Sequence, residues 1–296
     1  MTNRILVTGG KGMMGTDLCR ILGERGCDVV CTDIEEMDVR QPDLIMKRLA
    51  EVQPRVVVHL AALTDVDGCE RDPDAAYQTN ALGTQNVAWG CHKLGLEMVY
   101  VSTLSVFSGD SERAYTEFDE PDPRSWYSRA KHVGERFVRE LVPRHYVARA
   151  GWMFGGGVRD KKFVGKIIQL ARERPELKVV DDKFGSPTYT ADISLGIARL
   201  IDTGFYGTYH MVNTGPPVSR FDLATEILAQ AQVAGCRIVP VSSAEFPLPA
   251  PRPRMEAGRN YQLELRGLDW MRPWRQALSD YVARWLSEER TMAASP

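Results

Sequence analysis

Apolar residues in the first half of the chain form short continuous runs that alternate with helix-like stretches of mixed polarity. Runs that are apolar on both faces are typical of parallel strands covered by helices. Strands of this kind are predicted at residues 5–7, 28–31, 56–60, 98–102 and 146–148. Between them, the periodicity predicts helices at residues 12–26, 74–94 and 125–141. This alternation predicts an α/β fold with a doubly wound parallel sheet.

The second half of the chain is less regular, because proline and glycine interrupt the apolar pattern more often. A proline-rich loop is expected at residues 246–254 and a closing helix at residues 269–288. We expect residues 1–150 to form the doubly wound domain, to which part of residues 186–215 returns. Residues 151–296 are expected to form mainly a smaller C-terminal domain.

Charge adds little to this picture, since the 296 residues carry a formal net charge of -2. Such a balance gives no electrostatic basis for binding nucleic acid or an anionic membrane. No apolar run reaches the roughly 20 residues of a membrane-spanning helix. The chain also enters its first strand without a signal-peptide pattern. We therefore expect a cytoplasmic protein that binds neither nucleic acid nor membrane.

The cysteines and histidines indicate neither a disulfide framework nor a metal site. The 6 cysteines form no C-x-x-C pair, and the 5 histidines lack the spacing of metal ligands. We expect a reduced protein whose cysteines are small buried thiols, with no bound metal.

A glycine-rich segment, V-T-G-G-K-G-M-M-G at residues 7–15, joins the first strand to the first helix. Gly9 permits a tight turn, Gly12 lets a diphosphate approach the backbone, and Gly15 lets the helix pack close to the sheet. Met13 and Met14 begin the helix, whose free N–H groups suit phosphates. An ordinary glycine-rich turn has a similar composition, but the position at the first strand–helix junction favours a Rossmann-type dinucleotide site.

Asp33 follows the second strand, eighteen residues after Gly15. A carboxylate there accepts hydrogen bonds from the adenosine ribose and repels a 2′-phosphate, so NAD is slightly favoured over NADP. A solvated loop carboxylate is the alternative, because Glu35 and Glu36 lie nearby. Lys11 in the glycine loop leaves NADP open.

Candidate catalytic residues lie in W-Y-S-R-A-K at residues 126–131, where Tyr127 and Lys131 share one helical face. A nearby ammonium lowers the pKa of a phenol, which would make Tyr127 a general acid or base. The strand at residues 98–102 brings Thr103 to the sheet edge where ligands bind, in position to hydrogen-bond a reacting oxygen. A surface Tyr–Lys pair and an ordinary strand-end hydroxyl are the structural alternatives.

These motifs resemble the extended short-chain dehydrogenase/reductase family over nearly the whole chain. The general matches are T-G-G-x-G-x-x-G at residues 8–15, H-L-A-A at 59–62, N-A-L-G-T-x-N at 80–86 and the Tyr127/Lys131 pair. Within the family, the chain is most similar to the dTDP-4-dehydrorhamnose reductases. The segments that carry this closer similarity are 61–70, 102–107, 149–155, 184–188 and 250–253.

The resemblance implies a role for each matching residue. Thr103, Tyr127 and Lys131 match the family's catalytic residues. The cofactor-binding positions it implies, besides the glycine loop, are Asp33, Asp38, Val39, Ala61, Ala62, Thr64, Asn80, Tyr127 and Lys131. The substrate-binding positions it implies are Thr103, Ser105, Trp152 and Arg252. Trp152 as a core aromatic and Arg252 as a solvated loop residue are the alternatives.

The resemblance also implies a function, which is NAD(P)H-dependent reduction of a nucleotide-activated 4-keto-6-deoxy sugar in dTDP-rhamnose biosynthesis. Hydride would go to C4 and Tyr127 would donate the proton; the C-terminal domain would bind the substrate. The alternatives are a nucleotide-sugar epimerase or dehydratase, a non-catalytic NAD(P)-binding regulatory subunit, and a redox-sensing regulator. A homodimer is left open.

Two departures from the family pattern concern the substrate. Leu104 and Ser105 replace Asp-Tyr in S-T-D-Y-V-F, and the pattern R-P-x-N-S ends here in Met255 and Glu256. An acidic pair beside Thr103 is what a dehydratase would need, so its absence from the sequence favours simple reduction.

Overall fold

The computed structural model describes residues 3–157 and 162–293 and contains a six-stranded parallel sheet in the order β10-β5-β4-β3-β1-β2. The strands are β1 Arg4–Thr8, β2 Asp28–Thr32, β3 Val56–His59, β4 Glu97–Thr103, β5 His145–Ala150 and β10 Gly207–His210. The order reverses between β1 and β3, which opens a crevice at the carboxyl ends of these strands. The predicted doubly wound fold is confirmed.

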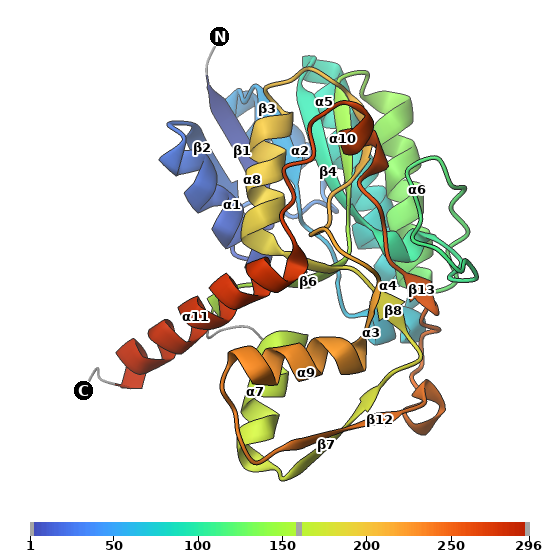
Figure 1. Ribbon diagram of the computed structural model, residues 1–296. Coiled ribbons are helices and arrows are strands. Elements are labelled where there is room, and N and C mark those ends of the chain that lie inside the picture. Colours follow the sequence, from blue (N-terminus) through green and yellow to red (C-terminus); the bar gives the residue numbers. More distant parts are fainter. Residues whose placement is uncertain (1–2, 158–161, 294–296) are drawn as a thin grey trace.

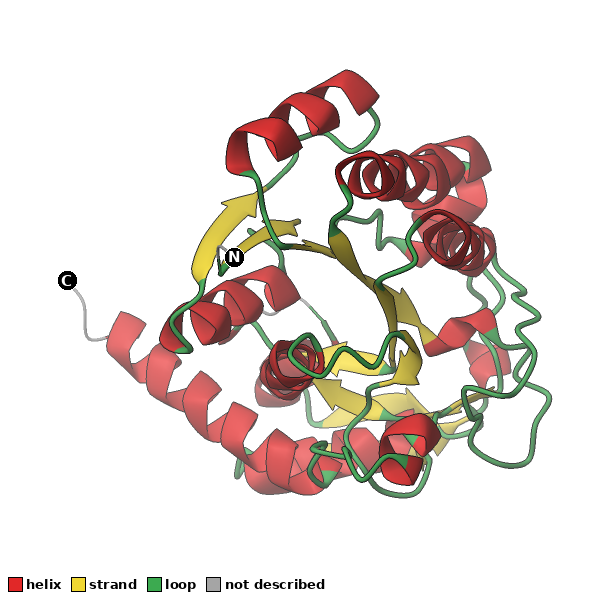
Figure 2. Cartoon of the chain, turned by 90° about the horizontal axis from the view of Figure 1, so that it is seen from above, coloured by secondary structure: helices red, strands yellow, loops and turns green. Residues whose placement is uncertain are grey.

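Helices cover both faces of the sheet, as its apolar strands require (Figures 1 and 2). One layer contains α1 Met13–Glu24 and α8 Thr190–Leu200, which pack against each other. The other contains α2 Pro42–Val52, α5 Gly83–Leu94 and α6 Trp126–Leu141. None of the helices described is long and apolar enough to cross a membrane.

The helix predicted at residues 74–94 is not one continuous α-helix. It consists of α4 Pro73–Ala76, the π-helical segment η1 Tyr77–Leu82 and α5, and it follows the short helix α3 Val66–Arg71. The π-helical hydrogen bond from Gly83 N–H to the Gln78 carbonyl adds one residue to the turn. The apolar periodicity could not reveal this, because one extra residue changes the spacing only locally.

The rest of the chain forms a second core below the sheet in Figure 1. Trp274, Tyr281 and Trp285 are buried in it. Its elements are β6 Trp152–Phe154, α7 Phe163–Glu173, β7 Glu176–Val180, β9 Pro187–Tyr189, α9 Arg220–Gln230, β12 Arg237–Val241 and α11 Trp274–Ala293. The smaller elements are η2 Leu104–Val106, β8 Phe184–Gly185, β11 Val218–Ser219, η4 Ser243–Glu245, β13 Met255–Glu256 and α10 Tyr261–Leu265.

The closing helix begins five residues later than predicted, at Trp274. Pro273 forms an isolated parallel bridge with Thr214, and Trp274 N–H donates to the Thr214 carbonyl. This pairing holds the segment before Trp274 in extended form, so a tertiary contact overrides the local helical pattern.

The expectation of fully reduced cysteines is wrong, because Cys19 and Cys31 form a disulfide. The pair joins α1 to β2, and their Cα atoms lie 6.7 Å apart. The spacing along the chain gave no sign of it, since the two residues meet only when the helix packs on the sheet. The four other cysteines are free thiols.

Candidate active site

A cavity of about 980 Å³ runs along the carboxyl ends of the strands and reaches the C-terminal segments. It collects most of the predicted site residues, which are Gly9, Gly12, Met13, Met14, Gly15, Asp33, Asp38, Val39, Ala61, Ala62, Thr64, Thr103, Ser105, Tyr127, Trp152 and Arg252. Asn80 and Lys131 do not line it; both are buried behind it. The cavity therefore brings the cofactor-binding and catalytic candidates together.

The glycine loop has the geometry that a diphosphate requires. Gly9 adopts a positive φ of 67°, and a Cβ there would lie 2.9 Å from the backbone nitrogen of Ala61. A Cβ at Gly15 would lie only 2.3 Å from the Gly9 carbonyl oxygen. Helix α1 begins just beyond Gly12, which makes no side-chain capping bond, so its first N–H groups suit an anion.

Acidic side chains surround the far end of this loop. The Asp33 carboxylate accepts a 2.9 Å hydrogen bond from Lys11 N–H. The Lys11 ammonium is itself held by Glu35 at 2.9 Å and Glu36 at 3.2 Å. Lys11 is therefore already neutralised, and the excess charge beside Asp33 is negative.

Asp38 and Val39 lie beyond this group, at the edge of the same cavity. Arg40 forms a bidentate pair with Asp38, and their shortest contact is 2.7 Å. The Arg40 guanidinium lowers the pKa of the Asp38 carboxyl group, through a hydrogen bond foremost. The Arg40 guanidinium therefore forms an ion pair with Asp38 at the edge of the cavity.

Asn80 acts on the site through the backbone. Its amide accepts a 2.8 Å bond from Leu63 N–H and donates a 3.0 Å bond to the Leu63 carbonyl. These bonds fasten the loop that contains Ala61, Ala62 and Thr64 against the π-helical segment. Asn80 therefore holds this loop in place; its support of a cofactor stays a prediction.

Thr103 ends β4 and begins a chain of hydroxyl groups. Its Oγ1 lies 3.0 Å from Ser105 Oγ, which accepts a 2.9 Å bond from Ser128 Oγ. Ser125 Oγ lies 2.8 Å from Ser128 Oγ and caps α6. Ser105, a departure from the family pattern, therefore orients Thr103 and ties it to the helix that carries Tyr127.

Tyr127 and Lys131 share one face of α6, but no hydrogen bond joins them within the described part of the chain. Lys131 Nζ donates to the Val101 carbonyl at 2.8 Å and lies 4.2 Å from the centroid of the Tyr100 ring. Burial lowers the pKa of Lys131 to about 7. Burial foremost raises the pKa of the Tyr127 phenol, with a further contribution from the charge of Glu256.

The prediction that the ammonium lowers the Tyr127 pKa is therefore wrong for this arrangement. The spacing of four residues correctly put both residues on one helical face, but it could not show that the lysine extends to a strand carbonyl. The phenol is protonated at neutral pH, as a proton donor must be, but its raised pKa gives it no advantage as an acid.

The end of the cavity lined by Trp152, Arg220, Arg252 and Glu256, which we call the sugar end after the substrate that the resemblance implies, includes two charged residues that sequence reasoning missed, Arg220 and Glu256. The Arg220 guanidinium lies 3.5 Å from the centroid of the Trp152 indole ring, and Trp152 Nε1–H donates to Glu256 at 2.8 Å. Arg252 pairs with Asp67 at 3.0 Å. Arg220 had no local motif to mark it, whereas Glu256 was visible only as a departure from the family pattern.

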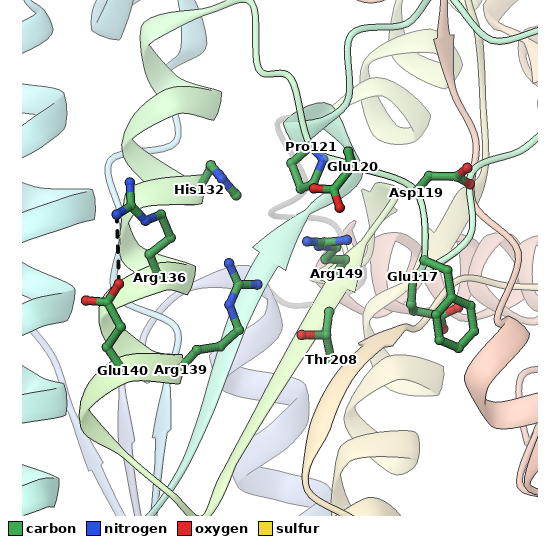
Figure 3. Close-up of a pocket in the computed structure, with 11 residues that line it drawn as sticks. Glu117, Asp119, Glu120, Pro121, His132, Arg136, Arg139, Glu140, Arg149 and Thr208 are labelled. Atoms are coloured by element: carbon green, nitrogen blue, oxygen red, sulfur yellow. Dashed lines mark ion pairs between the residues drawn. The ribbon is translucent and has the colours of Figure 1, made fainter.

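A second cavity, of about 570 Å³, lies between α6 and the loop of residues 117–121 (Figure 3). Its floor contains Arg149, whose guanidinium is paired with the buried Glu135 at 2.7 Å. None of the predicted site residues lines this cavity. We therefore assign the chemistry to the larger cavity at the strand ends.

Comparisons with known proteins agree with this geometry. The family model described as the RmlD substrate-binding domain matches residues 3–287. The chain belongs to this family. Within the extended short-chain dehydrogenase/reductases, RmlD-family membership confirms the predicted resemblance and the predicted class of NAD(P)-dependent oxidoreductase.

Individual relatives match over almost their whole length. The dTDP-4-dehydrorhamnose reductase of Mycobacterium tuberculosis is 36% identical over 287 residues, which cover 95% of this chain and 93% of that protein. The structure of the Bacillus anthracis dTDP-4-dehydrorhamnose reductase in complex with NADP superposes with a TM-score of 0.91 at 36% identity, covering 96% of this chain and 99% of that one. The Clostridium acetobutylicum reductase also gives a TM-score of 0.91, at 37% identity, covering 95% and 98%.

Proposed function

We propose that this RmlD-family protein reduces the 4-keto group of a nucleotide-activated 4-keto-6-deoxyhexose. The observation that carries the proposal is that one cavity joins a diphosphate-compatible glycine loop to two hydroxyl groups, of Thr103 and Tyr127, and to two arginines. Its relatives named dTDP-4-dehydrorhamnose reductase favour a dTDP-linked sugar as the first substrate to test.

Each residue has a distinct part in the proposed reaction. Bound NAD(P)H supplies the hydride for C4. Tyr127, whose phenol is protonated at neutral pH, donates its proton to the oxygen on C4 as negative charge develops there. Thr103, oriented by Ser105, donates a hydrogen bond to the same oxygen. Lys131, buried behind the cavity, supports the end of β4 through its hydrogen bond to the Val101 carbonyl.

The two arginines suit the diphosphate of the substrate. Arg220 and Arg252 both line the sugar end of the cavity, and planar guanidinium groups bind phosphate oxygens in pairs. At the opposite end, the acidic residues Asp33, Glu35 and Glu36 favour NADH over NADPH. The Bacillus anthracis relative binds NADP, so both cofactors belong in the test.

The other activities considered from the sequence have less support. Leu104 and Ser105 supply no carboxylate beside Thr103, as a 4,6-dehydratase would require. A non-catalytic regulator would not need the ordered hydroxyl chain from Ser125 to Thr103. Simple reduction needs the hydroxyl groups of Thr103 and Tyr127, and both line the cavity.

A turnover screen tests the proposal. The purified chain is mixed with dTDP-, GDP- and UDP-linked 4-keto-6-deoxyhexoses, each with NADH and with NADPH, and loss of absorbance of the reduced cofactor is followed. We expect reduction of at least one substrate, and a loss of about 10²- to 10⁴-fold in turnover for Tyr127→Phe. An unchanged rate in that variant would refute the assigned proton donor, and no turnover with any substrate would refute the reductase.

A further inference from the structure

Glu256 occupies an unusual place at the sugar end of the cavity. Among the described residues that line the cavity, the carboxylates are Asp33, Asp38 and Glu256, and the first two lie at the dinucleotide end. Glu256 belongs to β13, which pairs with β8 and sets Glu256 opposite Gly185. In Figure 1, β8 and β13 lie where the sheet meets the second core. The position therefore faces the part of the cavity assigned to the sugar.

Trp152 next to Glu256 is held by contacts on its ring and at its N–H. A Cβ at Gly185 would lie 2.2 Å from Trp152 Cε2, so the glycine backbone packs directly on the indole. The Arg220 guanidinium lies 3.5 Å from the ring centroid. The indole N–H is donated to Glu256. The ring is therefore fixed in place, and its position fixes that of the carboxylate.

The Glu256 carboxylate keeps acceptor capacity beyond this bond. An ionised carboxylate offers about four lone-pair sites, and the Trp152 N–H occupies one at 2.8 Å. Burial foremost raises the pKa of the Glu256 carboxyl group, while the Trp152 hydrogen bond and the charges of Arg220 and Arg252 lower it. Arg252 is itself paired with Asp67. The carboxylate is thus anchored at one oxygen by Trp152, with two guanidinium groups near it.

We propose that Glu256 is a specificity residue that accepts hydrogen bonds from a hydroxyl group of the hexose. This inference rests on the proposed function. The glutamate stands where the family pattern has serine, so it concerns this chain in particular. Glu256 would therefore discriminate hydroxylated hexoses from their deoxy analogues.

Removing the substrate hydroxyl and removing the Glu256 carboxylate should each lower kcat/KM, but the two losses should not add, because both break the same hydrogen bond. Charge-assisted hydrogen bonds correspond to roughly 10- to 100-fold in kcat/KM. For the wild-type protein, we expect one of the 2-deoxy and 3-deoxy analogues of the best 4-keto substrate to lose about that factor. Glu256→Gln should lose a similar factor on the full substrate, yet lose less than about threefold on that analogue, since the bond is already absent.

Two control variants distinguish the two possible roles of Glu256, which are to bind a sugar hydroxyl and to hold Trp152 in place. Trp152→Phe removes the N–H donor but keeps an aromatic ring, and it should leave the discrimination against the deoxy analogue in place. Glu245→Gln removes an exposed carboxylate bonded to Lys178, and it should leave both kcat/KM values unchanged. Thermal melting of each variant confirms that it is folded.

The outcomes distinguish this inference from the proposed function. If Glu256→Gln lowers kcat/KM equally on the full and deoxy substrates, the residue only anchors Trp152 and the specificity role is overturned. If the wild-type protein reduces none of the 4-keto sugars, the proposed function fails. In that case, calorimetric binding of dTDP-glucose and its deoxy analogues decides the role of Glu256. A preference for the hydroxyl that Glu256→Gln abolishes supports the role, and equal binding overturns it.

Discussion

The two ends of the cavity are built in different ways. The dinucleotide end is built around the backbone of one continuous segment, the glycine loop of residues 7–15, and residues 33–40 and 60–64 complete it. The sugar end is lined by side chains from separate segments, among them Trp152, Arg220, Arg252 and Glu256. The glycine loop tolerates little change, because a Cβ added at Gly9 or Gly15 would meet backbone atoms. Side chains from distant segments can be replaced one at a time.

The largest effect that we expect is on stability in acid, and it involves a histidine at each side of the sheet. His59 at the dinucleotide end hydrogen-bonds Thr8 and Thr84, whereas His210 on β10 has no hydrogen-bond partner for its ring among the described residues. Burial lowers the pKa of each to about 3. Below pH 6.5 the unfolded chain takes up protons that the folded chain does not, so stability is lost as the pH falls.

Each histidine should therefore reduce the free energy of unfolding by roughly 1.4 kcal/mol per pH unit between pH 6.5 and 3. Urea unfolding at a series of pH values measures this slope. His210→Gln should remove about half of the histidine contribution. An unchanged slope in that variant would show that His210 does not contribute.

The next largest effect should follow from Gly15→Ala, which tests the dinucleotide end alone. The new methyl group would overlap the carbonyl oxygens of Gly9 and Gly10 at 2.3 and 2.7 Å, and the loop must open to admit it. We expect affinity for NADH to fall by on the order of a hundredfold, about 2.7 kcal/mol, as measured by fluorescence titration. Gly23→Ala in the same helix is the matched control, because its Cβ meets nothing within 4 Å. It should leave NADH affinity unchanged.

A smaller effect is expected from Gly185→Ala, which is the corresponding change at the sugar end. Its Cβ would displace the Trp152 indole and the Glu256 bond with it. We expect KM for the sugar nucleotide to rise about tenfold, about 1.4 kcal/mol, while NADH affinity stays the same. A parallel loss of NADH affinity would contradict the independence of the two ends.

The smallest effect should be a change of cofactor preference in Asp33→Asn. Removing one negative charge beside the ribose reduces repulsion of a 2′-phosphate, although Glu35 and Glu36 remain. We expect the ratio of kcat/KM for NADPH to that for NADH to rise about fivefold, about 1 kcal/mol. Glu51→Gln, an exposed carboxylate on α2, provides a control for net charge and should not change the ratio.

The same contrast explains what the sequence could and could not predict. The parallel strands and the glycine loop follow from local patterns, because each depends on neighbours along the chain. The direction of the Lys131 side chain, the Arg220–Trp152–Glu256 group and the Cys19–Cys31 disulfide depend on elements that meet only after folding. The late start of α11 has the same origin, since Thr214 pairs with Pro273.

The π-helical turn at Tyr77–Leu82 adds one residue between α4 and α5 and so sets the rotation of one helix about its axis relative to the other. Tyr77, the first residue of the turn, contacts the Trp126 ring, and Thr84, two residues after the turn, hydrogen-bonds His59 of β3. Deleting one residue from this turn would give an uninterrupted α-helix, but would rotate one piece by about 100° relative to the other. Only one of the two contacts could then survive. Changes of chain length should therefore be tolerated in the loops that flank this region and be rejected within the turn itself.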